Sequence, residues 1–339
     1  MKIRILLTLI LLLGFYTAGA QIDRAKIAKE ADRFFQSENY SAAQPLYNQL
    51  LTLSLKDHDL NYKFGTCLLY TSHSKSSGLT RLEYAVESPS ISNEAWYYLG
   101  HANHLNYKFS VAIDCFDRYI AEASKDDPFI KRAITSIEQC KNAQKLLKNI
   151  TKLQIIAKRK MKTDHFFRLY DMDNIGGVII PVTDELLSKL DKKNNHFPIV
   201  HIPPWPKKSI YFSSYGQKGT NGLDLYKIDR LENGDFSEPQ ILPMTLNTSL
   251  DERYPFLSPN GKWLYFSSQG HNSMGGYDVF RCSYNVKTDK YGPPTNIDFP
   301  INSPGNDILY VHDSLYHRQY FTTDRASKFG EVYVYESSL

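Results

Sequence analysis

Cysteine is scarce in this chain, and the four that occur lie far apart. They are Cys67, Cys115, Cys140 and Cys282, in a chain of 339 residues. A zinc knuckle and a thioredoxin-like motif are both excluded, because each needs a closely spaced pair. A disulfide between Cys115 and Cys140 stays open, since the two lie on consecutive predicted helices at similar distances from the intervening turn. The alternative is a pair of buried thiols.

Long apolar runs are absent after the N-terminus. The one apolar stretch, residues 5–15, follows Lys2 and Arg4 and precedes the small residues 18–20. This order is typical of a cleaved secretory signal peptide over residues 1–20. The stretch is shorter than the roughly 20 residues that cross a bilayer, and no cysteine follows it to carry a lipid anchor. We therefore expect an exported chain that is soluble or peripheral.

A large excess of one charge is also missing. Lys and Arg number 40 and Asp and Glu 36, a formal net charge of +4 that falls when the signal peptide is removed. Nucleic acid is therefore not an expected partner. The sequence holds no Gly-x-Ser-x-Gly elbow, His-Glu-x-x-His helix or phosphate-binding glycine loop. We expect no catalysis, no metal site and no cofactor.

What the sequence does contain is, first, a repeat of about 34 residues. Small residues recur at Ala31, Gly65 and Gly100, with a second small series and a bulky series behind them. These are Ala43, Gly78 and Ala112, and Tyr47, Leu82 and Phe116. The pattern predicts three antiparallel helical hairpins over residues 21–127, whose small positions let paired helices cross closely. Residues 128–163 are then a capping helix and a basic linker.

The first helix of each hairpin would line the concave surface of this array. Five side chains there are expected to be free of packing and available to a peptide or helix of a partner. They are Tyr62, Thr66, Tyr97, His101 and His104. The alternative is that they are ordinary solvated residues. Catalysis by the histidines is not expected, because the same motif places no carboxylate or nucleophile beside them.

The connection after the helices is strongly basic. Residues 141–162 include eight basic residues and no acidic one. One interpretation is a solvated extension of the capping helix. The other is contact with an anionic envelope surface, such as lipid headgroups or acidic polysaccharide.

A second and longer repeat, of about 54 residues, fills residues 164–339. The run Tyr211–Ser214 returns at Tyr265–Ser268 and more weakly at Tyr320–Thr323. Downstream of it, Gly222–Tyr226 returns at Gly276–Phe280. Each unit would hold four short strands separated by turns rich in Gly, Pro, Asn and Ser. That order is typical of β-propeller blades.

Several residues of the middle unit are expected to serve the fold and not a ligand. Asn-Gly supplies the positive φ of a tight hairpin, glycine lets the backbone turn, and a buried aspartate can cap nearby amides. These structural positions are Ser258, Pro259, Gly261, Gly275, Gly276 and Asp278.

The run Ser258–Ser268 followed by Gly275–Phe280 resembles the PD40 repeat, a WD40-like unit of TolB-type propellers. Together with the N-terminal pattern, the chain is similar to tetratricopeptide plus PD40 proteins of the bacterial periplasm and outer membrane, some from type IX secretion and gliding machinery. The resemblance implies a multidomain α and β fold, with a tetratricopeptide α-solenoid before a β-propeller. It also implies a scaffold that binds other envelope proteins.

The resemblance is incomplete in one respect. Such proteins often carry an OmpA-like C-terminal domain, which is not found up to Leu339, and the third blade stops midway. We therefore expect an incomplete propeller of about three blades, where four to eight are usual. Either the chain is truncated or split, or the open edge is covered. Residues 165–180, a predicted helix over residues 183–192, or a second copy of the chain could cover it.

A carbohydrate-binding or carbohydrate-processing propeller is the competing function. Its acidic groups would be Asp251, Glu252, Asp278 and Asp307, with His271. Asp251-Glu252 and Asp307 recur at equivalent positions of successive units. Acids that recur once per blade usually serve turns, so protein binding remains the favoured function.

Overall fold

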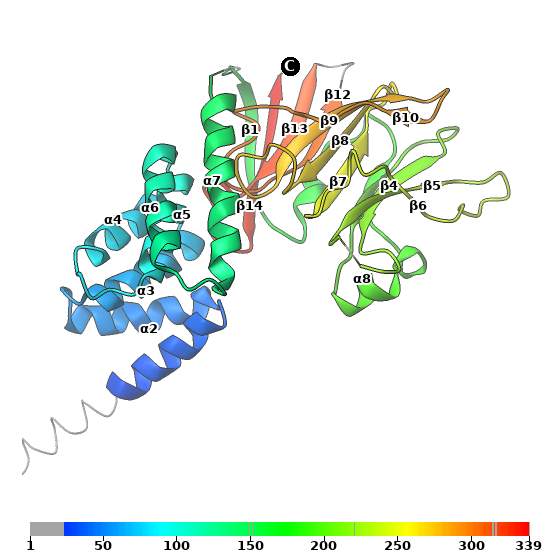
Figure 1. The fold of residues 1–339 in the computed structure, drawn as a ribbon. Coiled ribbons are helices and arrows are strands. Elements are labelled where there is room, and N and C mark those ends of the chain that lie inside the picture. Colours follow the sequence, from blue (N-terminus) through cyan, green and yellow to red (C-terminus); the bar gives the residue numbers. More distant parts are fainter. Residues whose placement is uncertain are drawn as a thin grey trace, which may run out of the picture.

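The computed structural model describes residues 24–148, 150, 152–219, 221–313, 315 and 317–338. The predicted signal peptide, residues 1–20, lies outside this range. Helices make up the first part of the described chain and antiparallel sheets the second (Figure 1). We call residues 24–146 the helical half and residues 154–338 the sheet-rich half.

The helical half is a series of antiparallel helices. A first helix covers residues 24–36. The others are α2 (Tyr40–Leu53), α3 (His58–Thr71), α4 (Ser76–Ala85), α5 (Glu94–Leu105), α6 (Phe109–Glu122) and α7 (Pro128–Leu146). Their starts are fixed locally: the carboxylate of Asp57 accepts from the amide of Leu60, and Asp127 caps α7 ahead of Pro128. Both are standard N-terminal signals.

Small residues lie where neighbouring helices approach most closely. A Cβ on Gly100 would come within 2.8 Å of the Phe116 ring, and one on Gly65 within 3.2 Å of the Gly78 carbonyl. Both distances are shorter than ordinary carbon contacts, so a larger residue would force α3 from α4 and α5 from α6. The predicted crossing of two small residues is confirmed for Gly65 and Gly78, whereas Gly100 packs against the Phe116 ring.

The sheet-rich half contains fourteen short strands among the described residues. They are β1 (Gln154–Lys162), β2 (Val178–Pro181), β3 (Ile199–Ile202), β4 (Ser209–Ser214), β5 (Asp224–Asp229), β6 (Gln240–Ile241), β7 (Glu252–Leu257), β8 (Trp263–Ser268), β9 (Asp278–Asn285), β10 (Lys290–Tyr291), β11 (Thr295–Asn296), β12 (Asp307–Asp313), β13 (Arg318–Thr323) and β14 (Glu331–Ser338). Short helices η1 (Phe166–Leu169), η2 (Asp184–Leu186) and α8 (Lys189–Lys193) lie between β1 and β3.

Three sheets follow the longer sequence repeat. Their orders are β4-β5-β6, β7-β8-β9 with β10 and β11 paired to β9, and β12-β13-β14-β1. The repeated Tyr-Phe-Ser-Ser run forms β4 and β8, and its weaker copy lies in β13. Strands β2 and β3 form a separate pair. The repeat therefore predicted the position of its recurring strands, but the expected four strands per unit are not found among the described residues of the first sheet, which has three.

The third sheet takes its outer strand from the basic segment between the two halves. Strand β1 pairs antiparallel with β14, and Lys160 stands opposite Tyr333. The expectation that the third unit stops midway is therefore wrong at this edge. So is a helical extension over residues 154–162. An unpaired β14 would expose a row of backbone donors and acceptors, and β1 satisfies them.

Residues 165–180 are one of the segments expected to cover the open edge, and their first part packs on the third sheet. Phe166 and Phe167 join Val332 and Val334 in one core cluster. The hydroxyl of Tyr170 donates to the Leu309 carbonyl at 2.6 Å, where the register of β12 shifts. A tyrosine hydroxyl thus satisfies a carbonyl that the bulge leaves out of the ladder.

The helix predicted over residues 183–192 is shorter than expected. It is divided into η2 and α8, and α8 begins with a capping box between Ser188 and Asp191.

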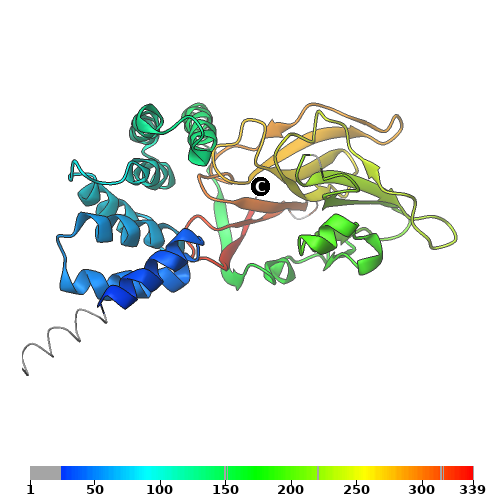
Figure 2. The ribbon, with the colours of Figure 1, turned by 60° about the horizontal axis from the view of Figure 1, so that its bottom comes forward.

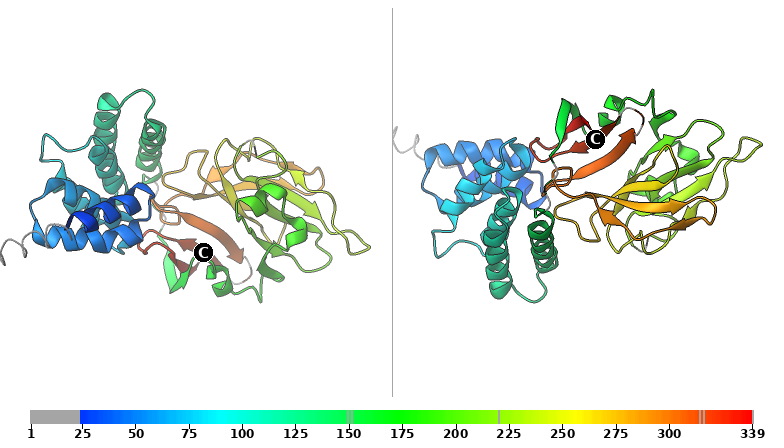
Figure 3. Two further views of the ribbon diagram at one scale, coloured as in Figure 1. Left: turned by 90° about the horizontal axis from the view of Figure 1, so that it is seen from below. Right: turned by 90° about the horizontal axis from the view of Figure 1, so that it is seen from above.

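The two halves of the molecule lie side by side, with loops of the sheet-rich half reaching the helices (Figures 2 and 3).

Candidate functional site

The helical half holds a loop of its own chain as it would hold an extended peptide. Three side chains bind three successive carbonyls of this loop, residues 273–275. Asn142 of α7 donates to Ser273 at 3.1 Å, His104 of α5 donates to Met274 at 2.7 Å, and Gln139 of α7 donates to Gly275. Contacts from side chains to main-chain carbonyls are a common way of binding a peptide backbone.

The side chain of Met274 anchors this loop. It is fully buried and belongs to the hydrophobic core of the helical half. A flexible thioether fills an irregular gap between helices well. The loop is therefore part of the helical core and not a surface contact.

A second loop, residues 327–329, contacts the other end of the same surface. Lys75 donates to the carbonyls of Leu69 at 2.7 Å and Ser327 at 3.1 Å. The amide of Phe329 donates to the Tyr70 carbonyl at 2.9 Å. The sheet-rich half is thus attached to the helices at two separate points.

Between these two attachments lies a cleft of about 570 Å³, which we call the junction cleft. Both halves line it. Its principal side chains are Tyr70, Lys75, Tyr97, His101 and His104 from the helices and Arg253, Tyr254, Tyr277, Asn306, Arg325, Phe329 and Glu331 from the sheets. Pockets of this size are typical of small-ligand sites and of peptide anchor sites at domain boundaries.

The two histidines of the cleft are uncharged at neutral pH. Burial lowers the pKa of His101 to about 3 and that of His104 to about 4. His104 uses Nε2 to donate to Met274, whereas His101 packs its ring against Tyr70 with centroids 6.0 Å apart. His101 is thus a neutral polar group at the cleft wall.

Two cations that line the cleft, Arg253 and Arg325, already contact other groups of the chain. Arg325 donates to Asp307 at 2.8 Å, to the Pro300 carbonyl at 2.8 Å and to Ile301. Arg253 lies over the rings of Tyr254 and Tyr277, at 5.2 and 5.9 Å from their centroids. Near Arg253 the cleft wall therefore consists of aromatic rings in contact with a guanidinium group.

The five side chains expected to face a partner divide into two groups. Tyr97, His101 and His104 line the junction cleft. Tyr62 and Thr66 are buried: the Tyr62 hydroxyl donates to Glu94 at 2.9 Å, and the Thr66 hydroxyl donates to the Tyr62 carbonyl at 3.0 Å. The expectation that all five are free of packing is wrong for four of them. Neighbouring helices cover Tyr62, Thr66 and Tyr97, whose ring contacts Phe116 and Phe129. The 273–275 loop covers His104, and His101 is half-buried.

The positions expected to be structural in the middle unit have structural contacts. Gly261 has a φ of +69°, and the amide of Trp263 donates to the Ser258 hydroxyl at 3.0 Å across the turn that contains Pro259. A Cβ on Gly275 would lie 2.3 Å from the Ser303 carbonyl. A Cβ on Gly276 would lie equally close to the Asn306 side chain. Loop packing therefore requires glycine at 275, where the neighbour is backbone, whereas at 276 the Asn306 side chain would have to move.

Asp278 is fully buried at the start of β9. One of its oxygens accepts from the amide of Met274 at 2.9 Å and from Asn296 at 2.8 Å. Burial raises the pKa of this carboxyl well above its usual range. Asp278 thereby shapes the loop that enters the helical half.

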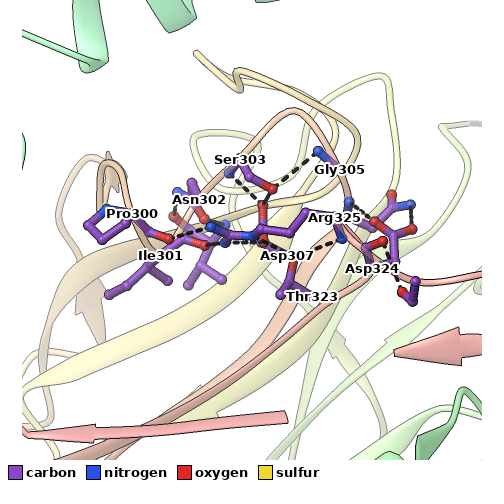
Figure 4. A network of polar contacts seen from close by, with 12 residues as sticks. Pro300, Ile301, Asn302, Ser303, Gly305, Asp307, Thr323, Asp324 and Arg325 are labelled. Carbon is purple, nitrogen blue, oxygen red and sulfur yellow. Dashed lines mark hydrogen bonds and ion pairs between the residues drawn. The ribbon is translucent and has the colours of Figure 1, made fainter. Parts of the chain in front are cut away.

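One buried carboxylate recurs in each sheet. Glu252 accepts from the amide of Thr248 and the hydroxyl of Ser268, each within 2.8 Å. Asp307 accepts from the amide and hydroxyl of Ser303 and from Arg325 (Figure 4). At the first sheet the corresponding carboxylate comes from helix α8: the hydroxyl of Ser214, at the end of β4, donates to Asp191 at 2.6 Å.

These contacts bear on the acids considered for a carbohydrate site. Glu252, Asp278 and Asp307 are each bound to loop amides or hydroxyls. Asp251 accepts from the amide of Leu223 at 3.0 Å, and His271 contacts the Leu246 carbonyl at 3.0 Å. Each of these groups therefore holds one loop to another. Sequence reasoning missed Asp191 because the first unit lacks a clear repeat around it.

Cys115 and Cys140 are free, buried thiols, as are Cys67 and Cys282. Burial raises the pKa of Cys115 to about 11 and that of Cys140 to about 12. Thiols of this kind are poor nucleophiles. The structure therefore agrees with the alternative of buried thiols.

Within the described part of the chain, no cluster of three or more His, Cys, Asp or Glu side chains could hold a metal ion. None of the described helices is both long and apolar enough to span a membrane. Comparison with protein-family models and with curated proteins gives no match for this chain.

Proposed function

We propose that this chain is an exported, non-catalytic scaffold of the bacterial cell envelope that binds other envelope proteins at the junction cleft. The helical half would be a tetratricopeptide-type array, and the sheet-rich half a propeller-type domain of PD40 blades. Association with secretion or outer-membrane machinery is part of the proposal. The observation that carries it is the junction cleft, whose walls come from both repeat arrays.

Two features support the assignment of modules. Close crossings at Gly65 and Gly100 recur with the helical period. In the sheet-rich half, β1 and β14 share one sheet although about 170 residues separate them in sequence. Pairing an early strand with the last sheet would cover one edge of that sheet, as expected for a propeller-type domain.

The chemistry of the cleft favours a peptide over a charged small molecule. Tyr70, Tyr97, Tyr254 and Tyr277 give it aromatic walls, and aromatic walls bind apolar side chains over a large area. His101 adds one uncharged polar group. Because the neighbouring 273–275 loop is already bound as a peptide, we expect an extended segment of the partner to continue along the same surface.

Site-specific photo-crosslinking in the native envelope tests this proposal. A photoreactive phenylalanine analogue would replace Tyr254, which lines the cleft, and in a second chain Leu55, which is 63% exposed on the helical half. We expect a discrete adduct with another envelope protein from position 254 and none from position 55. Equal adducts at both positions, or none at position 254, would contradict the proposal.

A further inference from the structure

Large apolar side chains stand at the turns of the sheet-rich half that point away from the helices. Trp205 lies in the turn before β4, Val286 in the turn after β9, and Leu315 in the turn between β12 and β13. Their exposed fractions are 59%, 71% and 72%. Leu231 and Phe236 are also exposed, in the turn after β5. A single exposed apolar side chain is common on a protein surface, so an interaction surface is indicated only where several of them lie at the same end of the strands.

The topology explains why these residues share one side. In an antiparallel meander, alternate turns lie at the same end of the strands. The turns that precede β9 and β14 reach the helical half, through residues 273–275 and 327–329. The intervening turns therefore point the other way, as Figures 1 and 3 show for the β9–β10 and β5–β6 hairpins. We call this side the distal face.

Basic residues accompany the apolar ones on the distal face. Lys262, Lys287 and Lys290 lie in or beside its turns and form no ion pair among the described residues. Lys207 and Lys208 follow Trp205 and border a recess of about 240 Å³ between the first two sheets. Lys207 donates to the Pro259 carbonyl, and Lys208 pairs with Glu232 at 3.7 Å.

The acidic residue Asp289 does not offset these cations, because it already has internal partners. Its carboxylate accepts from Lys227 at 3.1 Å and from the Tyr284 hydroxyl at 2.8 Å. The distal face is thus positive around Trp205 and Val286, whereas the turn that holds Leu231 and Phe236 carries the carboxylates of Glu232 and Asp235.

We propose that the distal face binds the surface of an anionic lipid bilayer. Its three most exposed apolar residues, Trp205, Val286 and Leu315, stand singly on separate turns, and lysines lie beside the first two. A protein partner usually requires a continuous, closely packed apolar centre with few charges. In a fluid bilayer, each exposed apolar side chain can insert separately. Lysines then contact anionic headgroups, and tryptophan lies at the membrane–water interface. This inference is independent of the junction cleft, which lies on the opposite side of the sheets.

Vesicle co-sedimentation of the full mature chain tests the inference. We expect binding to vesicles of phosphatidylglycerol and phosphatidylethanolamine, and at least tenfold weaker binding to phosphatidylcholine vesicles. The triple variant Trp205→Ser, Val286→Ser, Leu315→Ser should lose at least tenfold of the binding to anionic vesicles. So should the variant Lys262→Glu, Lys287→Glu, Lys290→Glu.

The matched control is Leu53→Ser, Leu55→Ser, which removes two side chains of similar exposure, 67% and 63%, from the helical half. It should bind as the unchanged chain does. Equal binding by the distal-face variants and the control, or equal binding to neutral and anionic vesicles, would overturn the inference.

A measurement on Trp205 alone avoids any effect of the triple variant on folding. Brominated lipids in anionic vesicles should quench tryptophan emission of the otherwise unchanged chain. That quenching should fall in Trp205→Phe and stay unchanged in Trp96→Phe, because Trp96 stacks with Arg118 in the helical half. Trp263 follows Lys262 at the start of β8 and keeps a share of the quenching in both variants. Equal quenching in Trp205→Phe and Trp96→Phe, or no quenching in the unchanged chain, would contradict the inference.

Discussion

At the scale of single residues, buried polar groups connect one loop to the next. Asp307 shows this best, because it binds Arg325, which in turn donates to the carbonyls of Pro300 and Ile301 (Figure 4). Burial raises the pKa of Asp307 and the Arg325 charge opposes that effect. A buried pair of this kind is costly to break, because the remaining charge keeps no partner.

We expect Asp307→Ala to lower the free energy of unfolding by about 3–5 kcal/mol, since it leaves Arg325 and the Ser303 amide without their acceptor. Urea denaturation measures the change. The control is Asp164→Ala, which removes an exposed carboxylate and should change stability by less than about 0.5 kcal/mol. Similar small losses for both variants would contradict the role given to Asp307.

Protonation of His104 makes the stability of the contact between the two halves depend on pH. Its pKa is about 4 in the folded chain and about 6.5 when unfolded. The unfolded chain therefore takes up a proton first as pH falls. Stability from neutral His104 is complete above about pH 6.5 and is lost between that value and about pH 4. Glu252, whose pKa is raised to about 7, acts in the opposite direction.

We expect His104→Gln to reduce this pH dependence, because glutamine keeps an N–H donor for the Met274 carbonyl and does not titrate. Between pH 7 and pH 5 the unchanged chain should lose about 2 kcal/mol more stability than the variant. Glu252 and His101 are common to both chains, so their effects cancel in the difference. Identical losses in urea denaturation at the two pH values would show that His104 is not buried as described.

At the scale of elements, the chain could be predicted where contacts are local and periodic. The helices follow from small residues such as Gly100, which repeat with the hairpin, and β4 and β8 follow from the repeated Tyr-Phe-Ser-Ser run. The structural roles of Gly261 and Asp278 could also be inferred, because turn chemistry depends on few neighbours.

Strand β1 could not be predicted in the same way. Its partner is β14, far away in sequence, and a run of lysines gives no sign of that pairing. The burial of residues on the concave helical surface was hard to predict for the same reason. Thr66 and His104 carry polar side chains typical of exposed positions, yet neighbouring helices and the 273–275 loop bury them. Contacts between distant segments decide exposure at both places.

A pair of engineered cysteines tests the position of β1. Lys160 and Tyr333 are directly opposite in the register, where Cα atoms lie roughly 4.5–5.5 Å apart, within the range of a disulfide. We expect Lys160→Cys with Tyr333→Cys to form an intramolecular disulfide on mild oxidation, detected by peptide mapping. Arg159→Cys with Tyr333→Cys is the control, because side chains of successive residues point to opposite faces. Comparable yields from both pairs would contradict the register.

At the scale of the whole molecule, contacts through the 273–275 and 327–329 loops join the two halves into one body. The 273–275 loop occupies part of the concave helical surface that the sequence predicts as a partner's binding surface. Met274 is part of the helical core. A partner is therefore expected at the junction cleft beside this loop, and the cleft exists only while the halves keep their relative position.

The distance between the halves tests this claim most directly. Spin labels would be placed at Lys56→Cys in the helical half and Lys287→Cys in the sheet-rich half, both exposed, while the four native thiols are buried. Pulsed dipolar spectroscopy should then show one narrow distance distribution, and Met274→Asp should broaden it, since a charge would be forced into the helical core. A broad distribution in the chain with Met274 intact would contradict a fixed arrangement of the two halves.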